Sequence, residues 1–216
     1  MSVKYKLVCF DMDGTLTKVR SSWGWVHDYY EVDNEESHDL FCAGKIDEPE
    51  FMRRDIAMWT QKNPNITVND VARTFSSMPL TNGIQETIAA LDFEGIKSVI
   101  VSGGIDSAAR MISEEYGFDD YLADSLETYE DGRLTGEGIM NVDLRDKGIS
   151  VREFQKKYGI AKEHTVSVGN SFVDIGMFKS SALSIAFNPI DDMVIEAADT
   201  VVRSENLADI LEKIFE

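Results

Sequence analysis

Residues 6–17 read KLVCFDMDGTLT, and this junction decides how the chain folds. The apolar run at 6–10 predicts a short β-strand buried on both faces, as in a parallel sheet. It ends abruptly at Asp11 and Asp13, which flank a single residue, and this indicates a functional loop at the carboxyl end of the strand. Gly14 then permits a close backbone approach or an unusual φ angle.

Outward from this junction, most of the chain alternates between apolar runs and helical patterns. The Asp131-Gly132 step within residues 126–138 signals a β-hairpin. The alternation predicts an α/β fold, a doubly wound parallel sheet with helices on both faces. Further strands are expected at 97–101, 121–123, 165–168, 184–187 and 200–202, and helices at 83–93, 105–116, 146–158, 173–180, 193–197 and 206–215.

One segment breaks this rhythm. Residues 18–78 are rich in Trp, Met, Glu and Arg and lack β-branched runs. Pro49 lies near the start of one helical stretch, and Thr67 or Asn69 could cap another. We predict a core domain of residues 1–17 and 79–216, with a small helical cap of residues 18–78 inserted after the first strand. Its helices are expected at 22–30, 35–42, 48–59 and 68–76.

Composition excludes several classes of function. The 216 residues carry 39 Asp and Glu against 21 Lys and Arg, a formal net charge of −18. Such a surface repels nucleic-acid phosphates and anionic lipid, so we expect no nucleic-acid or membrane partner. No apolar run approaches the length of a bilayer span, and the N-terminus reaches aspartates too soon for a signal peptide. We expect a cytoplasmic protein, a monomer or a homodimer.

Polar residues follow two other predicted strands. Ser102-Gly103-Gly104 comes after one, and Gly169-Asn170-Ser171, with Asp174 close behind, comes after another, while Lys147 opens a helix between them. These positions converge if the strands are neighbours, because parallel strands end at one edge of a sheet.

The convergent residues suit phosphate chemistry. Two close carboxylates such as Asp11 and Asp13 repel each other unless a cation lies between them, and Mg²⁺ commonly takes carboxylates together with a substrate phosphate. One carboxylate can attack phosphorus while the other handles the proton of the leaving group. Ser102 and the glycines offer an anion site, and Lys147 would offset the negative charge.

These four motifs, in this order, resemble those of the haloacid dehalogenase superfamily. The run Val-Ile-Val-Ser-Gly-Gly and the helical cap look most like its phosphoserine phosphatase branch. The resemblance implies a Mg²⁺-dependent phosphatase of a small phosphate ester, acting through an aspartyl-phosphate. It implies Asp11 as nucleophile and Asp13 as acid and base. Phosphate would be held by Ser102, Gly103 and Lys147, and Mg²⁺ by Asp11, the Asp13 carbonyl, Asn170 and, directly or through water, Asp174.

The chain departs from that branch at several positions. Asn170 stands where an aspartate usually binds Mg²⁺, and Val173 where an asparagine is typical. In the cap, Arg20 replaces a glutamate that meets the substrate ammonium. Asp55, or Arg54 in a shifted register, falls where an arginine meets the carboxylate. Either Arg20 binds an acidic group on a different substrate, or Arg20 and Asp55 pair with each other or face water.

Other readings of the motifs stay open. A phosphotransferase would share the same intermediate, and a binding or regulatory protein on this fold has Asn170 as its support. A dehalogenase is disfavoured because Asp13 has no obvious use in that reaction. The histidines His27, His38 and His164 show no metal-ligand spacing, so no role is assigned to them.

Overall fold

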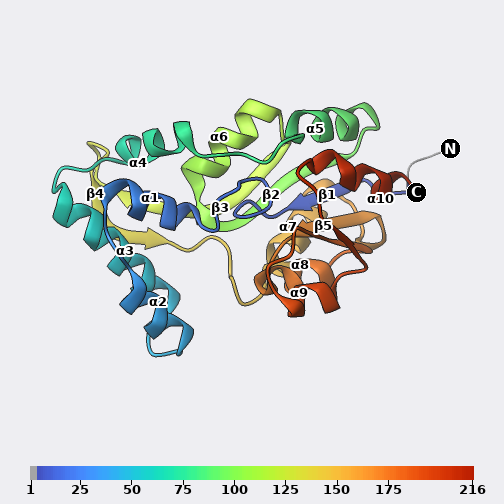
Figure 1. The fold of residues 1–216 in the computed structure, drawn as a ribbon. Coiled ribbons are helices and arrows are strands. Elements are labelled where there is room, and N and C mark those ends of the chain that lie inside the picture. The colour runs from blue at the N-terminus through green and yellow to red at the C-terminus, as the bar shows by residue number, and fades with distance from the viewer. Residues whose placement is uncertain (1–3) are drawn as a thin grey trace.

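A computed structural model describes residues 4–216 and shows a central seven-stranded sheet with helices on both faces (Figure 1). The strand order is β4-β3-β2-β1-β5-β6-β7, and every neighbouring pair is parallel except β3 and β4. This confirms the predicted doubly wound α/β fold. The strands are β1 Leu7–Phe10, β2 Lys97–Ile105, β3 Asp120–Thr128, β4 Leu134–Ile139, β5 Thr165–Gly169, β6 Leu183–Phe187 and β7 Thr200–Val202.

Strand β1 lies at the centre of the sheet, and its side chains alternate between two hydrophobic cores. Val8 and Phe10 pack in the core beneath α5 (Ile84–Phe93), α6 (Asp106–Tyr116) and α10 (Leu211–Phe215). Leu7 and Cys9 pack in the other core, under α7 (Gly148–Tyr158), α8 (Ile175–Lys179) and α9 (Asp192–Ala197). All four side chains are completely buried, as expected for a strand covered on both faces.

The register of the central strands brings the candidate site together. Phe10 pairs with Ile100 on β2 and with Val168 on β5. The residues that follow β1 and β5, and those at the end of β2, therefore meet at one edge of the sheet. Short 3₁₀ turns complete this half of the chain at η2 (Lys162–His164), η3 (Phe172–Asp174) and η4 (Leu207–Ile210).

Two strands are longer than predicted. Strand β2 continues to Ile105 rather than ending at 101, and its register with β3 shifts between Ser102 and Ile105. Strand β3 runs without interruption into the expected hairpin, whose turn includes Gly132 at φ +82°. Ser102 and the two glycines concealed the end of β2, which is buried although it is not apolar. The exposed residues at the end of β3 concealed the rest of that strand, because an apolar pattern does not extend to them.

The inserted segment forms the four predicted helices between β1 and α5. They are α1 Ser22–Tyr30, α2 Glu35–Cys42, α3 Glu48–Lys62 and α4 Val68–Thr74, followed by the 3₁₀ turn η1 Phe75–Ser77. Thr67 caps α4 in a capping box with Asp70, and Pro49 lies in the first turn of α3. None of the helices described in residues 4–216 is long and apolar enough to cross a membrane.

The chain leaves and re-enters the core at one place. Thr17 and Leu80 form an antiparallel bridge, and the Lys18 amide donates to the Pro79 carbonyl at 2.9 Å. These paired backbone segments support the proposed cap of residues 18–78. Residues 1–3 of the proposed core lie outside the described part of the chain.

The inserted helices rest on the hairpin as well as on the sheet. Met52 of α3 packs against Gly138 of β4, where an added Cβ would lie 2.4 Å from the Met52 Cε. Trp59 and Ile56, also from α3, are fully buried in the same core as Phe10. The cap helices and the sheet thus share one apolar core on this face.

Candidate active site

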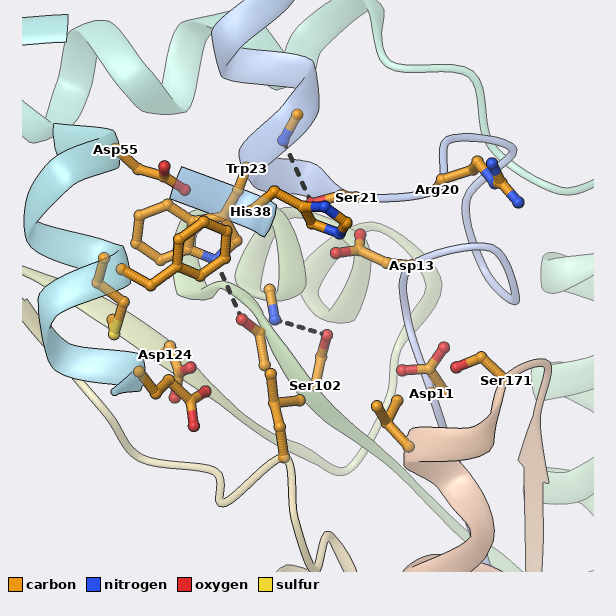
Figure 2. Close-up of a pocket in the computed structure, with 18 of the residues that line it drawn as sticks. Asp11, Asp13, Arg20, Ser21, Trp23, His38, Asp55, Ser102, Asp124 and Ser171 are labelled. Carbon is orange, nitrogen blue, oxygen red and sulfur yellow. Dashed lines mark hydrogen bonds between the residues drawn. The ribbon is translucent and has the colours of Figure 1, made fainter. Parts of the chain in front are cut away.

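A cavity of about 390 Å³ lies between the inserted helices and the carboxyl edge of the sheet. Figure 2 shows its lining, with Asp11 and Ser171 at one end and Asp55 and Asp124 at the other. Of the predicted site residues, the cavity brings together Asp11, Asp13, Arg20, Ser102, Gly103 and Lys147. Asn170 lines an adjoining hollow with Gly14, and Asp174 is wholly buried beneath the site.

Lys147 joins two carboxylates at the floor of the cavity. Its Nζ lies 2.6 Å from Asp11 Oδ1 and 2.7 Å from Asp174 Oδ1, and all three side chains are buried. Burial, reinforced by Asp174, raises the pKa of Asp11 to about 7 although Lys147 acts in the opposite direction. Burial alone would lower the pKa of Lys147, but the two carboxylates outweigh it and keep the ammonium charged.

Asp174 uses both of its oxygens within the protein. Oδ1 accepts from Lys147, while Oδ2 accepts the backbone N–H groups of Asn170 (2.9 Å) and Ser171 (3.1 Å). These bonds close a capping box at η3 and fix the loop after β5. The geometry therefore makes Asp174 an anchor for Lys147 and for the Asn170 backbone.

Asp13 is held on one side only. Its Oδ2 accepts from the backbone N–H (2.8 Å) and the hydroxyl (2.9 Å) of Ser22, the first residue of α1. Its Oδ1 is buried and has no hydrogen-bond partner among residues 4–216. Burial raises the pKa of Asp13 to about 6 against the lowering effect of the Ser22 bonds. A free, buried oxygen with a near-neutral pKa suits proton transfer.

The carboxyl end of β2, at Ser102–Gly104, is too crowded for larger residues. The Gly104 N–H donates to Ser102 Oγ at 2.9 Å, and the Trp23 indole donates to the Gly103 carbonyl at 3.0 Å. A Cβ on Gly104 would lie 2.5 Å from Ser22 Oγ and 2.7 Å from Asp13 Oδ2. The glycine therefore lets the β2 end approach the Asp13 loop closely.

Asn170 and Gly14 meet behind Asp11. Gly14 adopts φ +80°, and a Cβ there would lie 2.2 Å from Asn170 Nδ2. The Asn170 side chain is buried yet makes no hydrogen bond within the described residues, so its amide oxygen is available. No group of three or more His, Cys, Asp or Glu side chains in residues 4–216 is arranged to hold a metal. The Asn170 amide oxygen, a backbone carbonyl and the Asp11 carboxylate are nevertheless oxygen donors of the kind that hard cations take.

The inserted segment holds Arg20, Asp55 and Arg54, which stand at or beside the positions where the chain departs from the phosphoserine phosphatase pattern. Arg20 is exposed, and Figure 2 shows its side chain directed away from the middle of the cavity. Asp55 is 1% exposed and lies 3.2 Å from His27 Nε2, with Asn34 Nδ2 donating to it at 3.3 Å. The hypothesis that Asp55 pairs with Arg20 or faces water is therefore wrong. Arg54 pairs with Glu50 at 2.8 Å.

His27 has a structural role that its spacing in the sequence did not reveal. The Trp59 indole donates to His27 Nδ1 at 2.9 Å. An indole can only donate, so Nδ1 is the unprotonated nitrogen and Nε2 carries the hydrogen. Asp55 Oδ2 lies 3.2 Å from Nε2, but the pair lacks hydrogen-bond geometry. The three residues come from α1 and α3 and tie those helices together, and only the tertiary packing places them in contact.

Sequence reasoning also missed Glu48 and Asp124. Glu48, at the start of α3, is 9% exposed, and burial with repulsion from Asp124 raises its pKa to about 7. Asp124 Oδ1 accepts from the Asn141 and Val142 amides at 2.7 and 3.0 Å, and burial raises its pKa to about 7 as well. An acid at a helix start and an aspartate inside a strand carry no local sequence signal that they line a cavity.

The comparisons with known proteins agree with this geometry. Residues 8–179 match the family model of haloacid dehalogenase-like hydrolases, so the chain belongs to that family. It is 31% identical to a phosphoserine phosphatase of Methanocaldococcus jannaschii, over 99% of this chain and 100% of that protein. It is 30% identical to a phosphoserine phosphatase of Idiomarina loihiensis, over 95% of this chain and 91% of that protein.

Solved structures show the same likeness. A phospho-aspartyl intermediate analogue of phosphoserine phosphatase matches with a TM-score of 0.81 and 30% identity, covering 97% of this chain and 99% of that one. A substrate-bound phosphoserine phosphatase complex matches with a TM-score of 0.81 and 29% identity, covering 97% and 98%. Together with the site geometry, these matches make the chain a phosphatase of this family.

Proposed function

We propose that this phosphatase hydrolyses a monoester of a small phosphorylated metabolite through an aspartyl-phosphate on Asp11, with Mg²⁺ as cofactor. The observation that carries the proposal is the pairing of two unlike carboxylates in one cavity. Asp11 is fixed by Lys147, whereas Asp13 presents an unpartnered oxygen. Environments that differ in this way separate a nucleophile from an acid and base.

The proton balance follows from these two environments. A carboxylate oxygen of Asp11 forms a bond to phosphorus as the bond to the leaving oxygen breaks, and Asp13 donates its proton to that oxygen. Asp13 then takes a proton from water, whose oxygen attacks phosphorus and releases phosphate from Asp11. With its pKa raised to about 6, Asp13 can both give and accept a proton near neutral pH.

The phosphoryl group needs local positive charge and donors. Lys147 provides the buried charge, and the Ser102 hydroxyl and the segment at Gly103 lie in the same cavity. The overall acidic surface offers no such attraction, so these groups must provide it. We assign Ser102, Gly103 and Lys147 to phosphate binding on this basis.

The same geometry supports a cation site behind Asp11. The residues that would hold Mg²⁺ are Asp11, the Asp13 backbone carbonyl and Asn170, whose unbonded amide oxygen is the observation that favours the fit. When bound, Mg²⁺ would neutralise developing charge on the phosphoryl oxygens. We propose that Asp174 supports this site through its charge and by fixing the Asn170 backbone, since its oxygens already accept hydrogen bonds.

The metabolite itself is a separate question. The relatives are named for phosphoserine. In this chain, however, Arg20 lines the cavity with its side chain directed away from the middle, and Asp55 replaces an expected arginine. Transfer of the phosphoryl group to another hydroxyl, rather than to water, is the second candidate that the motifs allow. Adding alcohol acceptors to the assay separates the two, because transfer yields a new ester in place of free phosphate.

The test is phosphate release from a panel of small phosphomonoesters while Mg²⁺ is titrated. We expect Mg²⁺-dependent turnover that falls by about 10³-fold or more in Asp11→Asn, because the nucleophile is removed. Asp131→Asn, an exposed aspartate of the hairpin turn, is the matched control and should keep full activity. Turnover that survives Asp11→Asn, or no turnover across the panel at any Mg²⁺ concentration, would overturn the proposal.

A further inference from the structure

Both ends of the cavity carry carboxylates, but only the core end has a buried cation among them. The core end holds Lys147, whereas the cap end is lined by the carboxylates of Glu48, Asp55 and Asp124. The other basic side chains on the lining are Arg20 and His38, and both are exposed. Figure 2 shows Asp55 and Asp124 both on the side away from Asp11, Asp55 toward the top and Asp124 toward the bottom of the view. A substrate that fills the cavity therefore places its leaving group among acids.

Glu48 is the feature that points to a ligand. Its side chain lines the cavity and is nine-tenths buried, yet it makes no hydrogen bond or ion pair within residues 4–216. Of the charges that act on it, Asp124 and Asp143 disfavour its ionised form, and the opposing effect of Arg145 is the smallest. Its carboxylate oxygens stay accessible from the cavity, since they are not among the fully enclosed polar atoms without a partner. A mostly buried acid that opens only toward a cavity indicates a group that arrives there from outside.

The neighbouring acids are fixed in place. Asp124 is clamped by two backbone amides, and Asp55 by His27 and Asn34. The charge of Lys147 acts on Asp124, and Asp124 in turn acts on Glu48. Asp124 therefore lies within electrostatic reach of both Lys147 and Glu48, and all three line the same cavity.

The lining chemistry selects among leaving groups. A carboxylate would face like charges at this end, which costs binding energy. A polyol hydroxyl is both donor and acceptor and would find mainly acceptors here, whereas an ammonium group has three donors and no acceptor. Trp23 and Phe51 also line the cavity, and aromatic faces favour cations. A protonated amine satisfies all of these groups.

We propose that the cap end of the cavity, with Glu48 as its free ligand and Asp55 and Asp124 as supporting charges, binds a protonated amine. The substrate is then the phosphomonoester of an amino alcohol that carries no carboxylate. This inference rests on the proposed phosphatase function and assigns its substrate class. It places amine recognition at Glu48 rather than at position 20, where Arg20 stands in place of the usual glutamate.

Matched esters test the inference. The leaving group of O-phosphoethanolamine carries an amine alone, that of L-phosphoserine adds a carboxylate, and that of glycerol 3-phosphate is an uncharged polyol. We expect kcat/KM to be highest for phosphoethanolamine, by about 10- to 100-fold over glycerol 3-phosphate, the range of one charge-assisted contact. Phosphoserine should fall below phosphoethanolamine. A preference for glycerol 3-phosphate or for phosphoserine would overturn the inference.

Two glutamate variants of α3 test whether Glu48 recognises the amine. Glu48→Gln should lower the ratio of kcat/KM for phosphoethanolamine over glycerol 3-phosphate by about 10-fold or more, mainly through KM. Glu50→Gln removes a glutamate of the same helix that pairs with Arg53 and Arg54, and it should leave the ratio unchanged. An unchanged ratio in Glu48→Gln would count against the site.

A binding measurement separates this inference from the proposed function. In Asp11→Asn, which should bind without turnover, thermal shifts with the same three esters should follow the same order. Turnover with the opposite order would remove only the substrate assignment. If no ester is turned over, the proposed function fails. The thermal-shift order then decides the inference, and equal shifts for the three esters would overturn it.

Discussion

The two ends of the cavity show how differently core and cap treat buried charge. At the core end, Lys147 lies between Asp11 and Asp174, so each carboxylate has a close counter-charge. At the cap end, Glu48 has no partner, and it is less buried than that cluster, with 9% of its surface exposed to the cavity. The difference indicates that Asp11 and Asp174 have their counter-charge before substrate arrives, whereas Glu48 acquires a partner from the substrate.

The largest effect should come from removing the shared cation of the core end. Lys147→Met leaves Asp11 and Asp174 buried without a counter-charge, so we expect a loss of about 3–5 kcal/mol in the free energy of unfolding. Denaturant unfolding at pH 8 measures this. Lys157→Met removes an exposed lysine that pairs with Asp120 and should change stability little. Equal effects of the two variants would show that the core end does not depend on its ion pairs.

The next effect should come from the residue that connects the two regions. Ser22 Oγ donates to Asp13 and accepts from the Ile105 N–H at 3.0 Å. Ser22→Ala should cost about 1–3 kcal/mol, because it leaves that buried N–H unpaired. It should also lower kcat about 10-fold for every ester, because Asp13 acts on the leaving oxygen whatever group it carries.

Ser21→Ala is the control for this prediction. Ser21 caps α1 by accepting from the Gly24 N–H, so its loss should cost about 1 kcal/mol of stability. The kcat should fall much less than in Ser22→Ala. A parallel fall in both variants would indicate that kcat follows the stability of α1 rather than the position of Asp13.

A smaller effect concerns the metal. Asn170→Asp adds a charge beside Asp11, so the Mg²⁺ concentration needed for half-saturation should fall by about 10-fold, as measured by calorimetry without substrate. In the absence of Mg²⁺ the variant should be less stable than the parent, since one more carboxylate is buried. The exposed Asn65→Asp is the control and should change neither quantity. An unchanged Mg²⁺ affinity in Asn170→Asp would contradict the assigned ligand.

The fold and the convergence of the motifs at one edge of the sheet could be predicted for a common reason. Asp11 and Asn170 follow β1 and β5, and Ser102 lies near the end of β2, so the parallel topology brings them together without tertiary detail. The helices of the cap were also recognisable, since capping residues such as Thr67 act locally.

The cap end was not predictable, because its contacts depend on how helices pack. His27 and Asp55 lie on different helices, and nothing in either local pattern indicates that they meet. Glu48 follows Asp47 at the start of α3, where acids ordinarily stabilise the helix N-terminus. Only its burial in the cavity distinguishes it from such a residue.

The smallest predicted effect separates a binding residue from a structural one. Burial and Asp124 raise the pKa of Glu48 from its ordinary 4.5 to about 7, so its ionisation opposes folding as the pH rises from about 4.5 to 7. Glu48→Gln should therefore stabilise the ligand-free protein at pH 8 by about 1 kcal/mol, or roughly 2–4 °C in Tm, since solvent at the cavity screens part of the repulsion. The gain should vanish below about pH 4.5, where Glu48 is protonated in both states. Loss of stability at pH 8 would instead mean that Glu48 already has a structural partner, and the cap end would then resemble the core end.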